Sequence, residues 1–76
     1  MIENRLKKVI LTELNLEDFL FDESTVANMV PGWDSLSHAR IIMAVEEEFG
    51  IHFKTLEIIR MKNVGDLQNM INKKLE

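Results

Sequence analysis

The side chains of this chain best suited to chemistry lie in one short run, Pro31 to His38. The run reads Pro-Gly-Trp-Asp-Ser-Leu-Ser-His, so a carboxylate, a hydroxyl and an imidazole come close together at Asp34, Ser35 and His38. The same three residue types form the catalytic group of many hydrolases. Within little more than one helical turn, however, they cannot readily place a nucleophile, a base and an orienting group in line, and no oxyanion donors are evident. We therefore reject a hydrolase and ask where the Ser35 hydroxyl is placed.

Ser35 stands at the start of a predicted helix. Asp34 is a good N-cap, because its carboxylate can accept hydrogen bonds from the unpaired amides of the first turn. The helix begins at Asp34 or Ser35 and runs to about Phe49, and Gly50 follows where a C-terminal glycine is expected. A hydroxyl at this position is exposed, and a phosphodiester attached to it would meet free amides and the positive end of the helix dipole.

This helix carries apolar side chains on two opposite faces, given a rotation of about 100° per residue. The core face consists of Ile41, Ile42, Val45 and Phe49, and His38 falls among them. We expect His38 to be a partly buried histidine bonded to the loop or to a backbone carbonyl, and the alternative is that it influences a group attached at Ser35 or senses pH. The opposite face consists of Leu36, Ala39 and Met43, with Arg40 and Glu47 beside them. A domain this small cannot easily enclose a helix, so we interpret Leu36, Ala39 and Met43, which we call the docking strip, as a partner surface. Alternatively, the long loop before the helix folds over the strip and buries it.

Three further helices and a long connection complete the expected fold. Apolar residues at helical spacing predict a first helix over residues 2–14, which Asn15 can end in the left-handed conformation. A short helix covers residues 56–61, and Asn63 caps a fourth helix. The buried stripe of the fourth helix consists of Val64, Leu67, Met70, Ile71 and Leu75. The connection from residue 15 to 34 is rich in apolar side chains, so we expect it to pack over the helices. The sequence thus predicts an all-α four-helix bundle in one domain (1–76), with three main helices, a short third helix and a long first loop.

Composition excludes several functions. A net charge of −4 over 76 residues argues against a nucleic-acid binder, which needs clustered Lys and Arg. The chain has no cysteine, so it can build neither a disulfide nor a thiolate metal site, and thioester chemistry would need an added thiol. The consecutive glutamates 46–48 point in different directions on a helix, so no metal site is expected. No apolar run is long enough to cross a bilayer and no signal peptide is evident, so we expect a cytoplasmic monomer with no membrane partner.

The segment around Ser35 resembles the modification site of acyl carrier proteins. Asp34-Ser35-Leu36 matches the family's Asp-Ser-Leu core, and Val-Glu-Glu-Glu-Phe-Gly follows at residues 45–50. The resemblance extends to length and helix order over nearly the whole chain, and it is strongest over residues 31–53. It implies an acyl-carrier-like fold and a carrier that is not an enzyme.

The resemblance also implies a cofactor, partners and site residues. A phosphopantetheinyl transferase would attach 4'-phosphopantetheine to Ser35 from coenzyme A with Mg²⁺, and Asp34 would help to position this step. The arm would carry acyl intermediates as thioesters. Acyl-loading and acyl-using enzymes would dock on the helix that follows Ser35. The docking residues would be Leu36, Ala39, Arg40, Met43, Glu46 and Glu47.

Two residues depart from the family pattern. Trp33 stands where carriers of fatty acid biosynthesis usually have a small residue, and Arg40 stands where they are commonly acidic. We therefore expect a specialised freestanding carrier, for polyketide or nonribosomal products or for modified surface saccharides and lipids, rather than the housekeeping one. Two alternatives stay open, an aminoacyl or peptidyl carrier and an unmodified interaction module of the same fold.

Overall fold

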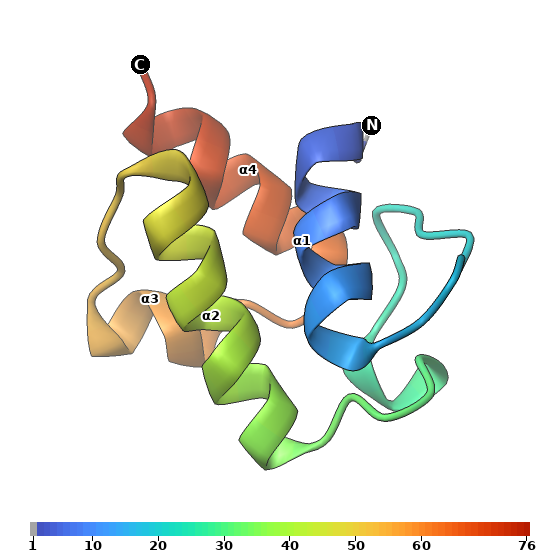
Figure 1. Ribbon diagram of the computed structural model, residues 1–76. Coiled ribbons are helices and arrows are strands. Elements are labelled where there is room, and N and C mark those ends of the chain that lie inside the picture. The colour runs from blue at the N-terminus through green and yellow to red at the C-terminus, as the bar shows by residue number, and fades with distance from the viewer. Residues whose placement is uncertain (1) are drawn as a thin grey trace.

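The computed structural model describes residues 2–76, which form helices joined by irregular segments (Figure 1). The elements are α1 (Asn4–Leu14), the short 3-10 turn η1 (Ala27–Met29), α2 (Ser35–Phe49), α3 (Thr55–Arg60) and α4 (Val64–Lys74). This confirms the predicted all-α fold with three main helices, a short third helix and a long first loop. Within the described residues, no helix is both long and apolar enough to cross a membrane.

Local sequence signals set most helix ends as predicted. Asn15 ends α1 and Gly50 ends α2 in the left-handed conformation, with φ angles of 56° and 66°. Asp34 and Asn63 cap α2 and α4, each with a side-chain oxygen that accepts a backbone N–H of the first turn. These contacts satisfy backbone groups that a helix end leaves unpaired.

The start of α1 and one predicted core residue at the end of α4 differ from the prediction. α1 begins at Asn4 rather than residue 2, since the backbone N–H of Glu3 donates to Gln68 Oε1 of α4 over 2.8 Å and Glu3 stays extended. α4 ends at Lys74, and Leu75, predicted to lie in the buried stripe, is 52% exposed. The prediction that Leu75 contributes to the core is therefore wrong.

The loop between α1 and α2 packs only in part, and it contains the turn η1, which the sequence analysis missed. Phe21 and Val30 are buried as expected, whereas Leu20 is 88% exposed and Met29 is 62% exposed. The predicted short helix also shifts by one residue, to Thr55–Arg60. Apolar residue types alone therefore overestimated how much of the loop is covered.

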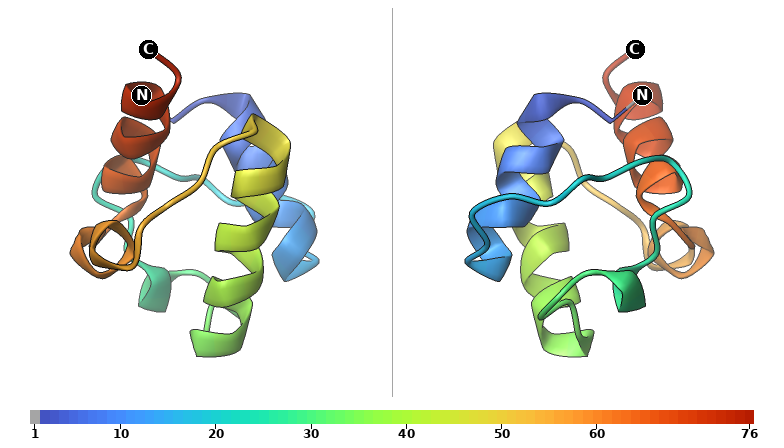
Figure 2. Two further views of the ribbon diagram at one scale, coloured as in Figure 1. Left: turned by 90° about the vertical axis from the view of Figure 1, so that its left-hand side faces the viewer. Right: turned by 90° about the vertical axis from the view of Figure 1, so that its right-hand side faces the viewer.

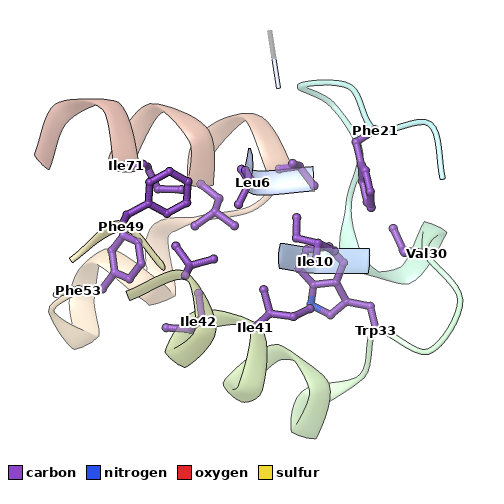
Figure 3. Packing of buried hydrophobic residues seen from close by; sticks show 13 residues of the cluster. Leu6, Ile10, Phe21, Val30, Trp33, Ile41, Ile42, Phe49, Phe53 and Ile71 are labelled. Carbon is purple, nitrogen blue, oxygen red and sulfur yellow. The ribbon is translucent and has the colours of Figure 1, made fainter. Parts of the chain in front are cut away.

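The core lies between all four helices and the loop (Figure 3). α1 and α2 lie closest together. The fully buried side chains are Leu6, Ile10, Ile41, Val45, Val64 and Ile71. Trp33, in the last loop residues before α2, joins this cluster and is only 9% exposed, so the residue that precedes Asp34 is held by the core.

The loop crosses the molecule from the end of α1 to the start of α4, where two backbone hydrogen bonds join it to that helix (Figure 2). The N–H of Val64 donates to the carbonyl of Thr25 over 2.8 Å, and the N–H of Gly65 donates to the carbonyl of Glu23 over 3.0 Å. A Cβ added at Gly65 would lie 2.6 Å from the Glu23 carbonyl oxygen. We call this contact between the loop and the start of α4 the seam. It requires a residue without a side chain at position 65.

A Gly65→Ala substitution should destabilise the protein by about 1–3 kcal/mol, because the new methyl group overpacks the seam. The sign is informative, since the same change inside an unobstructed helix stabilises by up to about 1 kcal/mol. Urea unfolding followed by circular dichroism measures the difference. Asn69→Ala, at an exposed position of α4, is the control and should be neutral or slightly stabilising. A Gly65→Ala protein as stable as this control would contradict the seam.

Candidate functional site

Ser35 is the first residue of α2 and lies at the end of the bundle opposite to the start of α1 and the end of α4 (Figures 1 and 2). Its side chain is exposed, and within residues 2–76 its hydroxyl has no hydrogen-bond partner. Asp34, the residue before it, accepts a hydrogen bond from the Ser37 backbone N–H through Oδ1 over 2.9 Å. The structure thus places Asp34 and Ser35 together at the helix start, as predicted, with the hydroxyl directed to no other residue.

The carboxylate of Asp34 is ionised at neutral pH. The hydrogen bond from the Ser37 N–H is the main cause that holds the pKa of Asp34 below its usual value. The side chain nevertheless remains in contact with solvent. The helix start therefore combines an accessible hydroxyl with a fixed negative charge, an arrangement that suits a reagent brought in with a divalent cation.

The docking strip is open to solvent. Leu36 is 69% exposed, Met43 is 66% exposed, and Ala39 between them is also exposed. The alternative that the long loop covers the strip is therefore wrong. Arg40 and Glu47 are exposed beside the strip, so the face carries one charge of each sign.

The neighbouring glutamates of α2 are held by other elements. Glu48 Oε2 accepts a hydrogen bond from Nε of Arg5 in α1 over 2.7 Å. Glu46 Oε2 accepts a hydrogen bond from the backbone N–H of Phe53 over 2.8 Å and lies 3.2 Å from His52 Nδ1. Of the two glutamates predicted to dock partners, Glu47 makes no hydrogen bond or ion pair within residues 2–76, whereas the Glu46 carboxylate joins α2 to the segment before α3.

His38 bonds the loop, as the sequence analysis expected of a structural histidine. The Trp33 indole Nε1–H donates to His38 Nδ1 over 3.0 Å, and the two rings are stacked with centroids 6.1 Å apart. In the sequence, Trp33 stands out only as a departure from a family pattern. The pair could have been inferred from two features of the sequence. Trp33, a donor, directly precedes the cap Asp34, and His38, an acceptor, lies about one helical turn into α2 on its core side.

Both residues of this pair line a cavity of about 60 Å³. It is lined by Ala27, Trp33, His38, Ile42, Met61, Lys62, Asn63, Val64 and Leu67. These residues come from the loop, α2, α4 and the segment between α3 and α4. The cavity could not be predicted from the sequence, because its walls meet only in the folded chain.

The Trp33–His38 pair should make stability depend on pH. Burial disfavours the imidazolium and holds the pKa of His38 below its usual value of about 6.5. The unfolded chain thus takes up the proton more readily than the folded one, so the contribution of His38 is complete above about pH 6.5 and falls as the pH drops toward the lower folded value. Protonation would also place a hydrogen on Nδ1 and break the bond from Trp33.

Urea unfolding between about pH 7.5 and 5 measures this dependence. The His38→Asn variant, which keeps an acceptor for the indole N–H, should lose most of it. His52→Asn should retain it, because the His52 side chain is 86% exposed. An equal loss of the pH dependence in both variants would rule out His38 as its source.

Two similar proteins show the family. The chain is 34% identical over 74 residues to the acyl carrier protein of Buchnera aphidicola subsp. Acyrthosiphon pisum (strain Tuc7). The aligned region covers 96% of this chain and 91% of that protein. The acyl carrier protein of strain APS is equally similar. The chain belongs to the acyl carrier protein family. Such proteins are carriers rather than enzymes, and they generally bear a phosphopantetheine prosthetic group.

A solved structure of an acyl carrier protein also has the same fold as this chain. The solution structure of a holo acyl carrier protein from Geobacter metallireducens matches with a TM-score of 0.87 and 34% identity, over 92% of this chain and 80% of that one. No protein-family model matches the sequence. The assignment of this carrier therefore rests on relatives that match nearly the whole chain and on the fold.

Proposed function

We propose that this carrier holds acyl groups as thioesters on a 4'-phosphopantetheine arm attached to Ser35 Oγ. The observation that supports this most is the exposed Ser35 hydroxyl at the start of α2, which has no hydrogen-bond partner among residues 2–76 and directly follows the ionised cap Asp34. The chain has no cysteine, so any thioester requires a thiol from an attached group. The arm supplies that thiol when it is bound.

The attachment itself would be a phosphoryl transfer. Ser35 Oγ attacks the phosphorus of coenzyme A that bears the pantetheine, the new P–O bond forms, and the bond to the leaving 3',5'-ADP breaks. The hydroxyl proton passes to a base of the phosphopantetheinyl transferase. Asp34 would favour the Mg²⁺ ion that accompanies coenzyme A, and the α2 amides would stabilise the phosphodiester.

Partner enzymes would dock on the face of α2 that continues from Ser35. The docking strip offers apolar contact area, and methionine adapts its shape to different partners. Glu47 adds a negative charge that suits basic partner surfaces, while Arg40 adds a positive one. Acyl-loading and acyl-using enzymes are the partners that this role requires.

Intact mass spectrometry tests the proposal directly. The protein is incubated with coenzyme A, Mg²⁺ and a broad-specificity phosphopantetheinyl transferase, next to a carrier known to be modified. We expect one phosphopantetheine to be added per chain. An unchanged mass with this transferase and with those of the source organism would favour an unmodified interaction module instead.

The positive charge of Arg40 predicts which partners are excluded. A fatty-acid ketosynthase whose basic surface pairs with an acidic residue at this position should elongate the acylated protein about tenfold more slowly than its own carrier. The reason is that Arg40 would replace an attraction between opposite charges by a repulsion between two positive charges. Arg40→Glu should recover part of this rate, and Lys8→Glu on α1 should not. Elongation of the unaltered protein at the housekeeping rate would contradict a specialised role.

A further inference from the structure

Two residues that line the cavity, Trp33 and His38, lie close to Ser35 along the chain. Trp33 stands two residues before the attachment position, and His38 stands one turn after it in α2. The lining also includes the apolar side chains of Ile42, Val64 and Leu67. A flexible arm on Ser35 that folds back toward the start of α2 would reach this cavity.

The polar groups around the cavity are hydrogen-bond donors. Because His38 Nδ1 accepts the indole N–H, the neutral ring carries its single proton on Nε2, which is a donor. Asn63 uses its side-chain oxygen to accept the Asp66 N–H, so its amide NH₂ remains to donate. Lys62 adds an exposed ammonium, and among the described residues no acidic side chain lines the cavity.

The size of the cavity limits what can enter. A cavity of about 150 Å³ holds benzene, with six carbon atoms, so 60 Å³ accommodates about two or three non-hydrogen atoms. A carboxylate has three. A long acyl chain would fit only if lining side chains moved, and one of them, Trp33, is held by the core and by the hydrogen bond to His38.

We propose that the Trp33–His38 pair makes this cavity a selectivity site for short acyl groups whose far end is a carboxylate. The inference rests on the proposed arm at Ser35 and names the class of cargo. A buried carboxylate is tolerated only where donors or a positive charge replace its water, and His38, Asn63 and Lys62 offer both. An apolar group of the same shape would leave these donors unpaired, which is costly.

The test compares three cargoes on the same protein. The transferase attaches the arm from succinyl-, 4-methylpentanoyl- and octanoyl-coenzyme A, and intact mass confirms each product. Succinyl and 4-methylpentanoyl have the same shape and differ only in the carboxylate. Trp33 is the only tryptophan, so its indole N–H gives a single resonance that reports on the cavity.

We expect succinyl alone to shift the Trp33 resonance relative to the unacylated arm. If the succinyl group occupies the cavity ten times more often than it stays in solvent, the melting temperature should rise by about 6–11 °C. His38→Asn keeps an acceptor for the indole but loses the Nε2 donor, so it should reduce the succinyl effect at least severalfold while the unacylated form stays folded.

Two results would overturn the inference by itself. One is a loaded succinyl arm that leaves the Trp33 resonance and the melting temperature unchanged. The other is an octanoyl or 4-methylpentanoyl arm that shifts and stabilises as much as succinyl does. Failure of the arm to attach at all would show as an unchanged mass, and it would overturn the proposed function and this inference together.

Discussion

The Ser35→Ala variant should take up no phosphopantetheine, while its free energy of unfolding changes by less than about 0.5 kcal/mol. The hydroxyl has no partner within the described residues, and the cap of α2 is supplied by Asp34 rather than by Ser35. Alanine is also the better helix former at an exposed first position. Loss of all modification without loss of stability is the signature of a residue that serves only attachment.

Ser37→Ala is the matched control for this experiment. Ser37 lies two residues further along α2, is buried, and its hydroxyl is 3.4 Å from an Arg40 nitrogen. Its replacement should leave attachment intact, as intact mass and urea unfolding will show. Phosphopantetheine on the Ser35→Ala protein would move the attachment site to another hydroxyl.

The Trp33→Ala variant should lose about 3–5 kcal/mol of stability, the usual cost of truncating a buried large aromatic side chain. A chain of 76 residues has about 4–11 kcal/mol in total, so this variant should be close to unfolding. Circular dichroism during urea unfolding is the suitable probe, since the variant has no tryptophan. Leu20→Ala, at an 88% exposed loop position, should change stability by no more than about 0.5 kcal/mol.

Trp33→Phe separates the two contributions of the indole. It keeps much of the packing but leaves His38 Nδ1 without a donor, which should cost about 1–2 kcal/mol. In a cycle with His38→Phe, the two changes should be coupled, because they remove the same hydrogen bond. Additive effects would mean that Trp33 stabilises the fold through packing alone.

The parts of this structure that could be predicted from the sequence are those decided within a few residues. The cap Asp34, the left-handed glycine Gly50 and the cap Asn63 all act on the adjoining turn, and all were predicted correctly. The exposed docking strip followed from two apolar faces on a helix with few neighbours. The position of Ser35 followed from the same helix start.

The parts that could not be predicted depend on segments far apart in the chain. The bond from Glu3 to Gln68 spans nearly the whole sequence, and it moves the start of α1. The exposure of Leu20 could not be inferred, because an apolar side chain in a loop says nothing about which neighbours cover it. The cavity is the clearest case, since the positions of Met61 and Lys62 beside His38 depend on how α3 is placed.

The placement of Ser35 at the opposite end of the bundle from the start of α1 and the end of α4 has a practical consequence (Figure 1). A tag, a surface linker or a second protein joined after Glu76 would stand away from the α2 start and from the docking strip. The carrier could thus be tethered to a bead or built into a synthetic assembly line while both remain reachable by a freely diffusing enzyme.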